Sequence, residues 1–408
     1  MIAAPGRAGL AYADARGQIR FDERAEPLAD GGFVRPAEPD ELIEAPPGTV
    51  PALLPGRAPR IRGATPARRT ALSVLLPAGY TRLLLPAYRA RGDAPTLPLF
   101  GYTFACARED RLFVAAMRTD ASDDWAPRRF APGELEGLIA ARRAALPRNR
   151  ILAQLAICAS EYACFTAQNV FLARGEAALP VSPKCNARCL GCISEQEPEA
   201  GIPSPQARVA EEADARELAE VALAHLARVP EGIVSFGQGC EGEPLLRATT
   251  IARALAQIRA ASRAGTINCN TNGSLPRALQ RLIGAGLDAV RISLNSFRPA
   301  VYAAYYRPQG YGLDDVFESV RLAANAKLRV SLNLLTHPGV TDAREEVRAA
   351  ADFLRSVRLT MIQTRTLNID PAVYFAAVGR PQSGPLGMRA ALADLAARAP
   401  LGNFTHAH

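Results

Sequence analysis

The sequence predicts an α/β protein, because short apolar stretches alternate with amphipathic stretches over residues 176–366. Such alternation is typical of parallel strands joined by crossover helices. The stretches expected to form strands are 177–183, 232–236, 266–270, 289–295, 329–335 and 360–368. An eight-unit (β/α) barrel takes about 250 residues, so six units should need roughly 190. The length of the alternating region therefore predicts a partial (β/α)6, TIM-like barrel.

Helices are expected between these strands wherever apolar residues recur at helical spacing. They lie at 208–228, 248–261, 276–285, 314–326 and 342–357. One further helix is expected at 386–397. We therefore expect the barrel core at 171–370 and a C-terminal tail with one helix at 371–408.

The first 170 residues lack this alternation. Residues 1–70 are rich in Pro and Arg, and closely spaced prolines disfavour long helices and central strands, so an irregular segment is expected. Residues 71–170 hold two strand-like stretches joined by a polar turn at 108–111, followed by helices at 132–145 and 150–163. These pieces predict a small α+β domain as an N-terminal extension of the barrel.

Composition is that of an ordinary globular protein, with 49% hydrophobic and 22% charged residues in a chain of 408. The formal net charge of +8 would suit nucleic acid. However, nearly all the cations are scattered arginines, and without a dense basic run we do not expect a nucleic-acid partner. No signal-peptide pattern opens the chain and no apolar run is long enough to span a membrane, so a cytoplasmic protein without a membrane partner is expected.

Three of the eight cysteines are closely spaced after the first expected strand. Cys185, Cys189 and Cys192 have the spacing C-x3-C-x2-C. Three thiolates in this arrangement suit three irons of a cubane cluster, whose fourth iron is open to a ligand that is not protein. A structural zinc site completed by another residue, such as Cys164 or His225, is the alternative on ligand chemistry alone.

The cysteine spacing and the motifs after it resemble the radical S-adenosylmethionine (radical SAM) superfamily. Gly242, Glu243 and Pro244, after the second strand, resemble the end of the family's GGEP motif, which holds the amino group of SAM. Thr271 and Asn272, at the end of the third strand, resemble its T-N-G segment beside SAM or the substrate. Each string also has a purely structural explanation, a strand-to-helix turn for the first and an Asn-Gly turn for the second.

Polar residues on the later strands extend this resemblance. Arg291, Ser293 and Asn295 alternate on the fourth strand and should share one face, where polar side chains need partners. The resemblance implies that Ser293 contacts the SAM carboxylate and that Asn295 contacts the ribose. Asn333 repeats the pattern on the fifth strand, and Leu367 on the sixth is expected against adenine.

Residues past the strand ends are expected to face the substrate. The catalytic candidates are Gln238, Arg365 and above all Glu241, since a carboxylate there could bind a cation or move a proton. Asn270 and Arg307 should line the same side. In the cysteine loop, the residue before the third cysteine is usually aromatic in the family and packs near adenine. Gly191 stands there in this chain, so the adenine-packing surface is not defined by the motif.

Three other cysteines, Cys158, Cys164 and Cys240, have no place in the first cluster but could approach one another. Buried packing residues are expected, with a second metal site as the alternative. The last cysteine is Cys269, so no auxiliary cluster is expected after the barrel.

The resemblance implies an enzyme with a [4Fe-4S] cluster and SAM as cofactors and an external flavodoxin- or ferredoxin-like electron donor. Reduction would cleave SAM to methionine and a 5′-deoxyadenosyl radical, which would abstract hydrogen from a small-molecule or peptide substrate. An oxidoreductase, a transferase and a lyase all fit this chemistry. The alternatives are an RNA-modifying radical SAM enzyme and a non-enzymatic zinc or iron–sulfur binding module.

Overall fold

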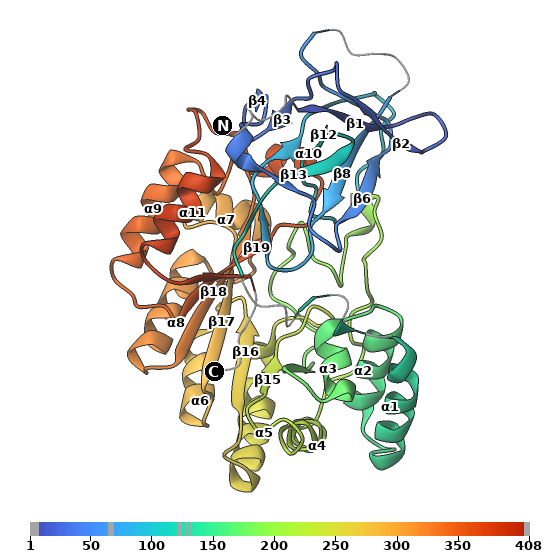
Figure 1. Cartoon of the computed structure of the whole chain (residues 1–408). Helices are drawn as coiled ribbons and strands as arrows, with labels where there is room; N and C mark the ends of the chain where they lie inside the picture. Colours follow the sequence, from blue (N-terminus) through green and yellow to red (C-terminus); the bar gives the residue numbers. More distant parts are fainter. Residues whose placement is uncertain (1–7, 64–68, 121–124, 127–128, 131, 404–408) are drawn as a thin grey trace, which may run out of the picture.

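A curled parallel sheet forms the larger part of the molecule (Figure 1). The computed structural model describes residues 8–63, 69–120, 125–126, 129–130 and 132–403. In spatial order the strands are β14 (Glu176–Leu179), β15 (Ile233–Phe236), β16 (Thr266–Thr271), β17 (Ala289–Leu294), β18 (Arg329–Thr336), β19 (Met361–Thr366) and β20 (Leu401–Gly402). The six expected strands are all present and each pairs in parallel with the next, which confirms the α/β fold and the partial barrel. The two-residue strand β20 extends the sheet beyond the prediction.

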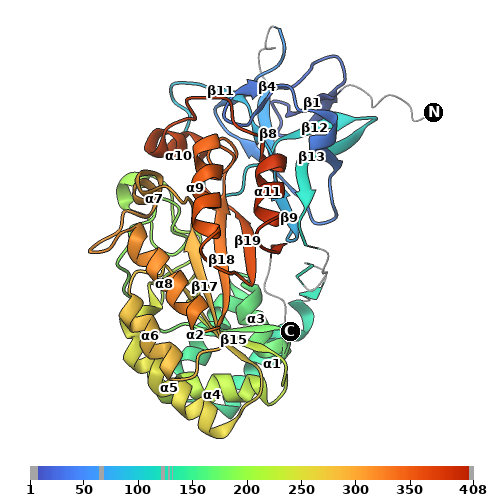
Figure 2. The same cartoon turned by 90° about the vertical axis from the view of Figure 1, so that its left-hand side faces the viewer.

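Helices cover the convex face of this sheet, as Figure 2 shows from the side of α8 and α9. They are α4 (Ala215–Leu226), α5 (Ala248–Ala261), α6 (Pro276–Gly284), α8 (Leu313–Asn325), α9 (Arg344–Leu354) and α11 (Met388–Ala396). The strand sequences explain which face they cover. Val290, Ile292 and Leu294 on β17 are buried, whereas Arg291 and Ser293 between them are only partly buried. The apolar face packs against the helices, and the polar face forms the concave floor of the half-barrel.

Helix α4 begins later than the sequence predicts, at Ala215 instead of 208. Its N-cap is Asp214, whose carboxylate accepts the backbone N–H of Glu217 at 2.8 Å. The Glu217 carboxylate accepts the backbone N–H of Asp214 in return, which completes a capping box. Residues 206–209 are therefore outside the helix and form a connection that lies against the cysteine loop.

The N-terminal segment is a compact arrangement of short strands, so the expectation of an irregular segment over 1–70 is wrong for its described residues. The strands are β1 (Gly9–Ala13), β2 (Ile19–Asp22), β3 (Ala29–Asp30), β4 (Val34–Arg35), β5 (Leu42–Glu44), β6 (Val50–Leu54), β7 (Arg57–Pro59), β8 (Thr70–Leu75), β9 (Tyr80–Arg82), β10 (Leu85–Pro86), β11 (Tyr88–Ala90), β12 (Ala105–Arg108) and β13 (Arg111–Arg118). The described prolines do not prevent this, because most of them lie between strands or at strand ends, and Pro51 lies in the edge strand β6. We call residues 9–118 the β unit.

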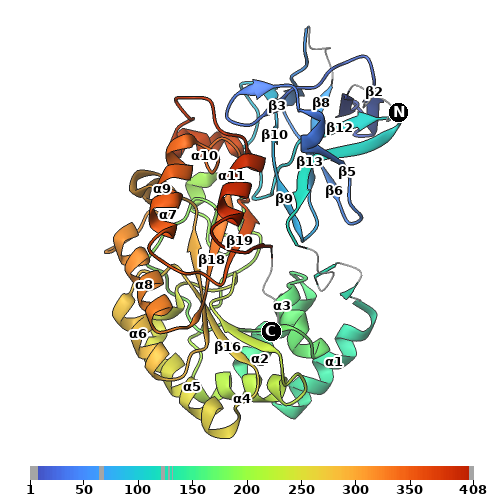
Figure 3. The same ribbon diagram turned by 60° about the vertical axis from the view of Figure 1, so that its left-hand side comes forward.

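The helices expected within 71–170 pack against the half-barrel. α1 (Pro132–Ala145), α2 (Arg150–Ser160) and α3 (Phe165–Leu172) lie beside β14 and α4 at one end of the half-barrel (Figure 3). Asn149, the N-cap of α2, donates its amide to the Glu217 carbonyl on α4 at 2.9 Å. The expected α+β domain is therefore divided in the structure, with its strands in the β unit and its helices on the barrel.

The β unit contacts the half-barrel beyond the carboxyl ends of β18 and β19. Arg82 is fully buried and donates to the carbonyl of Tyr102 at 2.9 Å and to those of Thr336 and Leu367 at 3.4 Å. The hydroxyls of Thr81 and Thr364 lie 2.7 Å apart. Of the helices in the described ranges, none has the length and apolar character needed to cross a membrane.

Candidate active site

The three closely spaced cysteines lie in a loop after β14 that is paired with the end of α7 (Pro299–Tyr306). The backbone N–H of Arg188 donates to the Tyr306 carbonyl, and that of Leu190 donates to the Tyr305 carbonyl, both at 3.0 Å. Gln309 donates its N–H to the Asn186 carbonyl at 2.9 Å. These bonds fix the backbone from Asn186 to Leu190, on both sides of the second cysteine.

A second set of contacts joins the cysteine loop to the loop after β15. The Gly242 N–H donates to the Ser182 carbonyl at 2.7 Å, and the Glu243 N–H donates to the Lys184 carbonyl at 2.8 Å. A Cβ atom at Gly242 would lie 2.0 Å from the Lys184 oxygen, so only glycine permits this approach. The expected cluster loop and the expected SAM loop are therefore in direct contact.

The three thiols are close enough to affect one another electrostatically. Burial raises the pKa of Cys185 to about 11. Burial, and then the neighbouring Cys192 and Cys185, raise the pKa of Cys189 well above its usual value, while the charge of Arg208 opposes both increases. Three thiolates held together in this way need a cationic group, and an iron–sulfur cluster fits that donor set.

Within the described ranges, no three His, Cys, Asp or Glu side chains converge on the position of a single metal ion.

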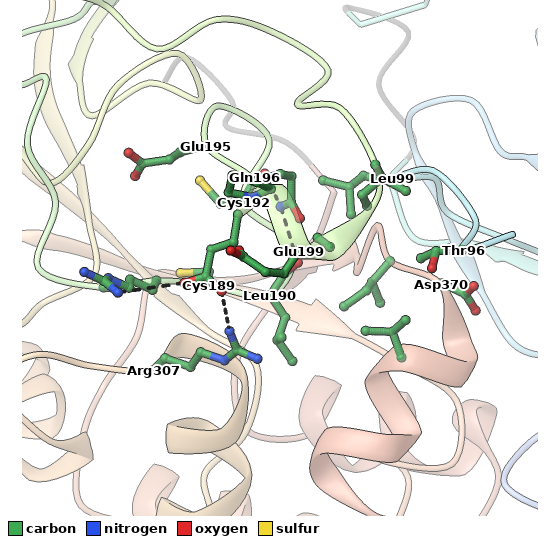
Figure 4. A pocket seen from close by; sticks show the side chains of 18 of the residues that line it. Thr96, Leu99, Cys189, Leu190, Cys192, Glu195, Gln196, Glu199, Arg307 and Asp370 are labelled. Atoms are coloured by element: carbon green, nitrogen blue, oxygen red, sulfur yellow. Dashed lines mark hydrogen bonds and ion pairs between the residues drawn. The ribbon is translucent and has the colours of Figure 1, made fainter.

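Cys189 and Cys192 line a cavity of about 590 Å³ between the cysteine loop and the β unit (Figure 4). On the side opposite the cysteines lie Thr96 and Leu99 of the β unit and Asp370, the N-cap of α10 (Pro371–Val378). Residues 195–200 form a further wall. The cavity depends on the β unit for one of its sides.

Glu243 lies where the resemblance places a ligand for the SAM amino group. It is 3% exposed, and its carboxylate accepts the N–H groups of Asn272 and Leu245 at 2.8 and 2.9 Å and the Thr271 hydroxyl. Burial raises the pKa of Glu243 to about 7. No ion pair to Glu243 is formed within the described residues. A buried carboxylate without a cation fits a ligand ammonium group, and the structure brings Glu243, Thr271 and Asn272 together around it.

The concave floor carries the polar residues expected on β17 and β18. The Asn333 amide donates to the Ser293 hydroxyl at 3.4 Å, and the Asn333 Oδ1 is buried with no hydrogen-bond partner in the described part of the chain. Arg291 pairs with Glu176 at 3.3 Å. Arg365 is exposed on the same face and donates to the Asn403 carbonyl at 2.8 Å. The floor thus offers hydroxyl, amide and guanidinium groups to a ligand.

Two of the expected SAM contacts lie deeper than the floor. Asn295 is 1% exposed and donates its amide to the Tyr374 hydroxyl at 3.1 Å, although its Oδ1 has no partner among the described groups. The Leu367 side chain is also 1% exposed, and its carbonyl accepts from Arg82. The structure does not bring the Leu367 side chain to the concave surface.

Glu241 does not project into the substrate space, contrary to the sequence-based expectation. The residue is 5% exposed, and its carboxylate accepts the N–H groups of Val181, Ser182 and Gln238 at 2.7–2.8 Å. Burial raises the pKa of Glu241 to about 8. Gln238 is likewise used in the loop, because its amide donates to the Ser235 carbonyl at 2.7 Å. Both side chains stabilise the turn after β15.

Sequence reasoning missed two side chains beside the cysteines. A Cβ at Gly191 would lie 2.9 Å from the Tyr305 hydroxyl, so an aromatic ring from α7 lies beside the position where the family usually has an aromatic residue. The two adjacent tyrosines at 305–306 are the one feature of the sequence that could have indicated an aromatic ring beside the cysteine loop. Arg208 donates to the Cys192 sulfur at 3.4 Å, and nothing in the local sequence distinguishes it from the other arginines.

Cys158 and Cys240 are both buried, and the Gln154 amide donates to the Cys158 sulfur at 3.5 Å. The neighbouring Cys240 thiol lowers the pKa of Cys158 below its usual value. Cys164 lies nearby, but its thiol contacts the Thr166 hydroxyl at 3.3 Å. The three do not converge on a common ligand position in the described structure.

The fold and the site together define an enzyme class built on a half-barrel with a three-cysteine loop. Residues 179–354 match the family model described as the radical SAM superfamily. Residues 179–354 of the chain are therefore the domain of a radical SAM enzyme, whose cofactors are a [4Fe-4S] cluster and SAM. This finding supports the enzyme over the alternative of a non-enzymatic zinc or iron–sulfur binding module.

Similar proteins include a GTP 3′,8-cyclase of Heliobacterium modesticaldum, which is 33% identical over 195 residues, covering 47% of this chain and 54% of that protein. The human molybdenum cofactor biosynthesis protein 1 is 31% identical over 170 residues, covering 40% of this chain and 24% of that protein. The chain thus spans about half the length of the first relative and about a quarter of the second. A radical SAM methyltransferase from Sphaerobacter thermophilus is similar in structure, with a TM-score of 0.40 and 18% identity over 55% of this chain and 65% of that chain.

Proposed function

We propose that this enzyme acts on a small molecule or a peptide that binds between the half-barrel and the β unit. The observation that carries the proposal is the cavity of about 590 Å³ that two of the three loop cysteines share with the β unit. Cavities of roughly 300–1,000 Å³ are typical of small-molecule sites. When bound, the cluster and SAM supply a 5′-deoxyadenosyl radical, and the chain positions a hydrogen of the substrate and limits access of water.

A purine nucleotide is the first substrate to test, because the relatives include enzymes named GTP 3′,8-cyclase. The guanidinium group of Arg365 on the concave floor supports this candidate, since Arg suits phosphate oxygens. Arg307, which lines the cavity, and Asn270 on β16 are the other residues proposed to face the substrate. A peptide and an RNA are the remaining candidates.

The residues proposed to hold the cofactors follow from the contacts above. Cys185, Cys189 and Cys192 would each bind one iron. Glu243, with Thr271 and Asn272 behind it and Gly242 and Pro244 on either side of it, would receive the SAM ammonium group. Ser293 and Asn333 would contact polar atoms of SAM, and the Asn295 Oδ1 is a further acceptor. The buried Leu367 side chain would pack beneath the proposed SAM-binding surface without contacting SAM.

The proposal is tested on anaerobically reconstituted full-length chain, reduced with dithionite in the presence of SAM. We expect an iron–sulfur absorbance band and 5′-deoxyadenosine by mass spectrometry, and both should be lost when the three loop cysteines are replaced by Ala. Ser293→Ala should weaken SAM binding by about ten- to a hundredfold, because a hydrogen bond to a charged group contributes roughly 1.5–3 kcal/mol.

Deuterated GTP, deuterated ATP and a deuterated synthetic peptide mixture would identify the substrate class. Deuterium in 5′-deoxyadenosine with only one of these probes assigns the class. Unchanged SAM cleavage in the triple cysteine variant would contradict the site itself. Salt-sensitive RNA binding together with no transfer from the three probes would favour RNA.

A further inference from the structure

Arg208 makes a direct contact with one of the loop cysteines. Its Nη2 donates to the Cys192 sulfur at 3.4 Å, and its Nε donates to the Ser194 hydroxyl at 3.2 Å. Its Nη1 binds the carboxylate of Glu195. The guanidinium therefore bridges the third cysteine and the chain that follows it, with all three of its nitrogens engaged.

The position of Arg208 is fixed by the backbone on both sides. The N–H of Gln206 donates to the Ile193 carbonyl at 3.2 Å, and the N–H of Val209 donates to the Cys240 carbonyl at 2.8 Å. The connection between the cysteine loop and α4 is thus tied to the loops after β14 and β15. The Arg208 side chain is only 12% exposed, so water screens its charge little.

From this contact we infer that Arg208 is a positioning residue that raises the reduction potential of the iron–sulfur cluster through its hydrogen bond to the Cys192 sulfur. The inference rests on the proposed role of Cys192 as an iron ligand. A reduced cluster carries one more electron than the oxidised cluster, and part of that charge is on the thiolate sulfurs. A cationic donor therefore stabilises the reduced state more, and hydrogen bonds to the sulfurs are among the factors that set cluster potentials.

Arg188 provides a matched control in the same loop. It precedes Cys189 and also lines the cavity, but its side chain is 66% exposed and faces Glu197 at 3.9 Å. Arg188→Gln removes one positive charge near the cluster without removing a bond to a thiolate. A difference between the Arg208 and Arg188 variants separates the specific hydrogen bond from the general charge of the loop.

The experiment is a redox titration of the reconstituted full-length chain without SAM, with the reduced cluster monitored by electron paramagnetic resonance. We expect a lower midpoint potential in Arg208→Gln than in the unmodified chain, at equal iron content. Arg188→Gln should retain the original midpoint. With dithionite as reductant, SAM cleavage should be slower in Arg208→Gln than in the unmodified chain. The rate should recover with a lower-potential reductant such as Ti(III) citrate. A merely structural defect would not show this recovery.

An unshifted midpoint in Arg208→Gln at full iron content would overturn the inference. If that variant binds no iron, Arg208→Lys replaces it. Lys lacks the planar fork that lets Arg208 bind the sulfur and Glu195 together, so the cluster of Arg208→Lys should also have a lower midpoint potential than the unmodified chain. An unshifted midpoint potential in Arg208→Lys would also overturn the inference. Full iron content in Cys192→Ala would instead contradict the assignment of Cys192 as a ligand, whatever the result for Arg208.

Discussion

The guanidinium of Arg57 and the carboxylate of Asp370 form a buried ion pair of 3.0 Å between the β unit and α10. Their side chains are 4% and 3% exposed. Asp370 also accepts the N–H groups of Leu97 and Ala372 at 2.9 Å. One carboxylate thus caps α10, holds the β unit and fixes residues 96–99 at the wall of the cavity.

Replacing Asp370 should destabilise the whole molecule. Asp370→Ala leaves the Arg57 charge buried without its partner, which typically costs about 3–5 kcal/mol. Urea unfolding of the chain without cofactors measures this loss. The control is Asp394→Ala, whose ion pair with Arg398 is more exposed and should contribute less than about 1 kcal/mol. Equal losses in the two variants would contradict a joining role for Asp370.

Substitution of Gly242 should affect the cofactor site more than the fold. In Gly242→Ala the new methyl group would meet the Lys184 carbonyl, so the cysteine loop and the Glu243 loop must move apart. We expect lower iron content and SAM binding at least about tenfold weaker, equivalent to about 1.4 kcal/mol. Gly284→Ala is the matched control, because a Cβ at Gly284 meets nothing within 4 Å. Normal iron content and SAM affinity in Gly242→Ala would show that the contact is dispensable.

Stability should depend on pH through Glu346 on α9. The residue is 3% exposed, and its carboxylate accepts the Ser296 hydroxyl and the Phe297 N–H. Burial raises the pKa of Glu346 from 4.5 to about 7. Between these values the folded chain retains a proton that the unfolded chain loses. The free energy of unfolding should therefore fall by up to about 3 kcal/mol as pH rises from the unfolded pKa to the folded pKa.

The glutamine side chain in Glu346→Gln cannot ionise, so this variant should lack the pH-dependent part of the free energy of unfolding. Urea unfolding of the unmodified chain and of Glu346→Gln, measured at about pH 5 and about pH 7.5, shows how much stability each loses as pH rises. Glu345→Gln is the control, since the side chain of Glu345 is 39% exposed. A constant difference between the unmodified chain and Glu346→Gln across this range would contradict the raised pKa.

The thiols of Cys158 and Cys240 should not form a second metal site. When Cys185, Cys189 and Cys192 are replaced together, the folded chain should contain neither iron nor zinc, because no third ligand converges on the Cys158–Cys240 pair within the described residues. Elemental analysis of the triple variant tests this expectation. Metal that persists in the triple variant and is lost when Cys164 is also changed would establish the second site.

The barrel could be predicted because each of its longer strands and helices has a recognisable pattern within its own stretch of sequence. Each apolar strand and each amphipathic helix from 176 to 366 carries its own periodicity, and the helices 132–145 and 248–261 have the bounds that the sequence predicts. Short elements were missed. The helices α3, α7 and α10 have only eight residues each, too few for a clear period, and the strands of the β unit are stabilised by pairing with distant segments.

By itself, the sequence determined the fold class, the three-cysteine loop and the order of the motifs after it, because spacing along the chain is sufficient to indicate cluster chemistry and parallel strands. Tertiary structure decided the direction of individual side chains. Glu241 turns inward to three backbone N–H groups, whereas Arg208 turns toward Cys192. It also decided where the β unit closes the cavity, through pairs such as Arg57 and Asp370. Contacts between residues hundreds of positions apart have no periodic signature, since they depend on how separately formed elements pack together.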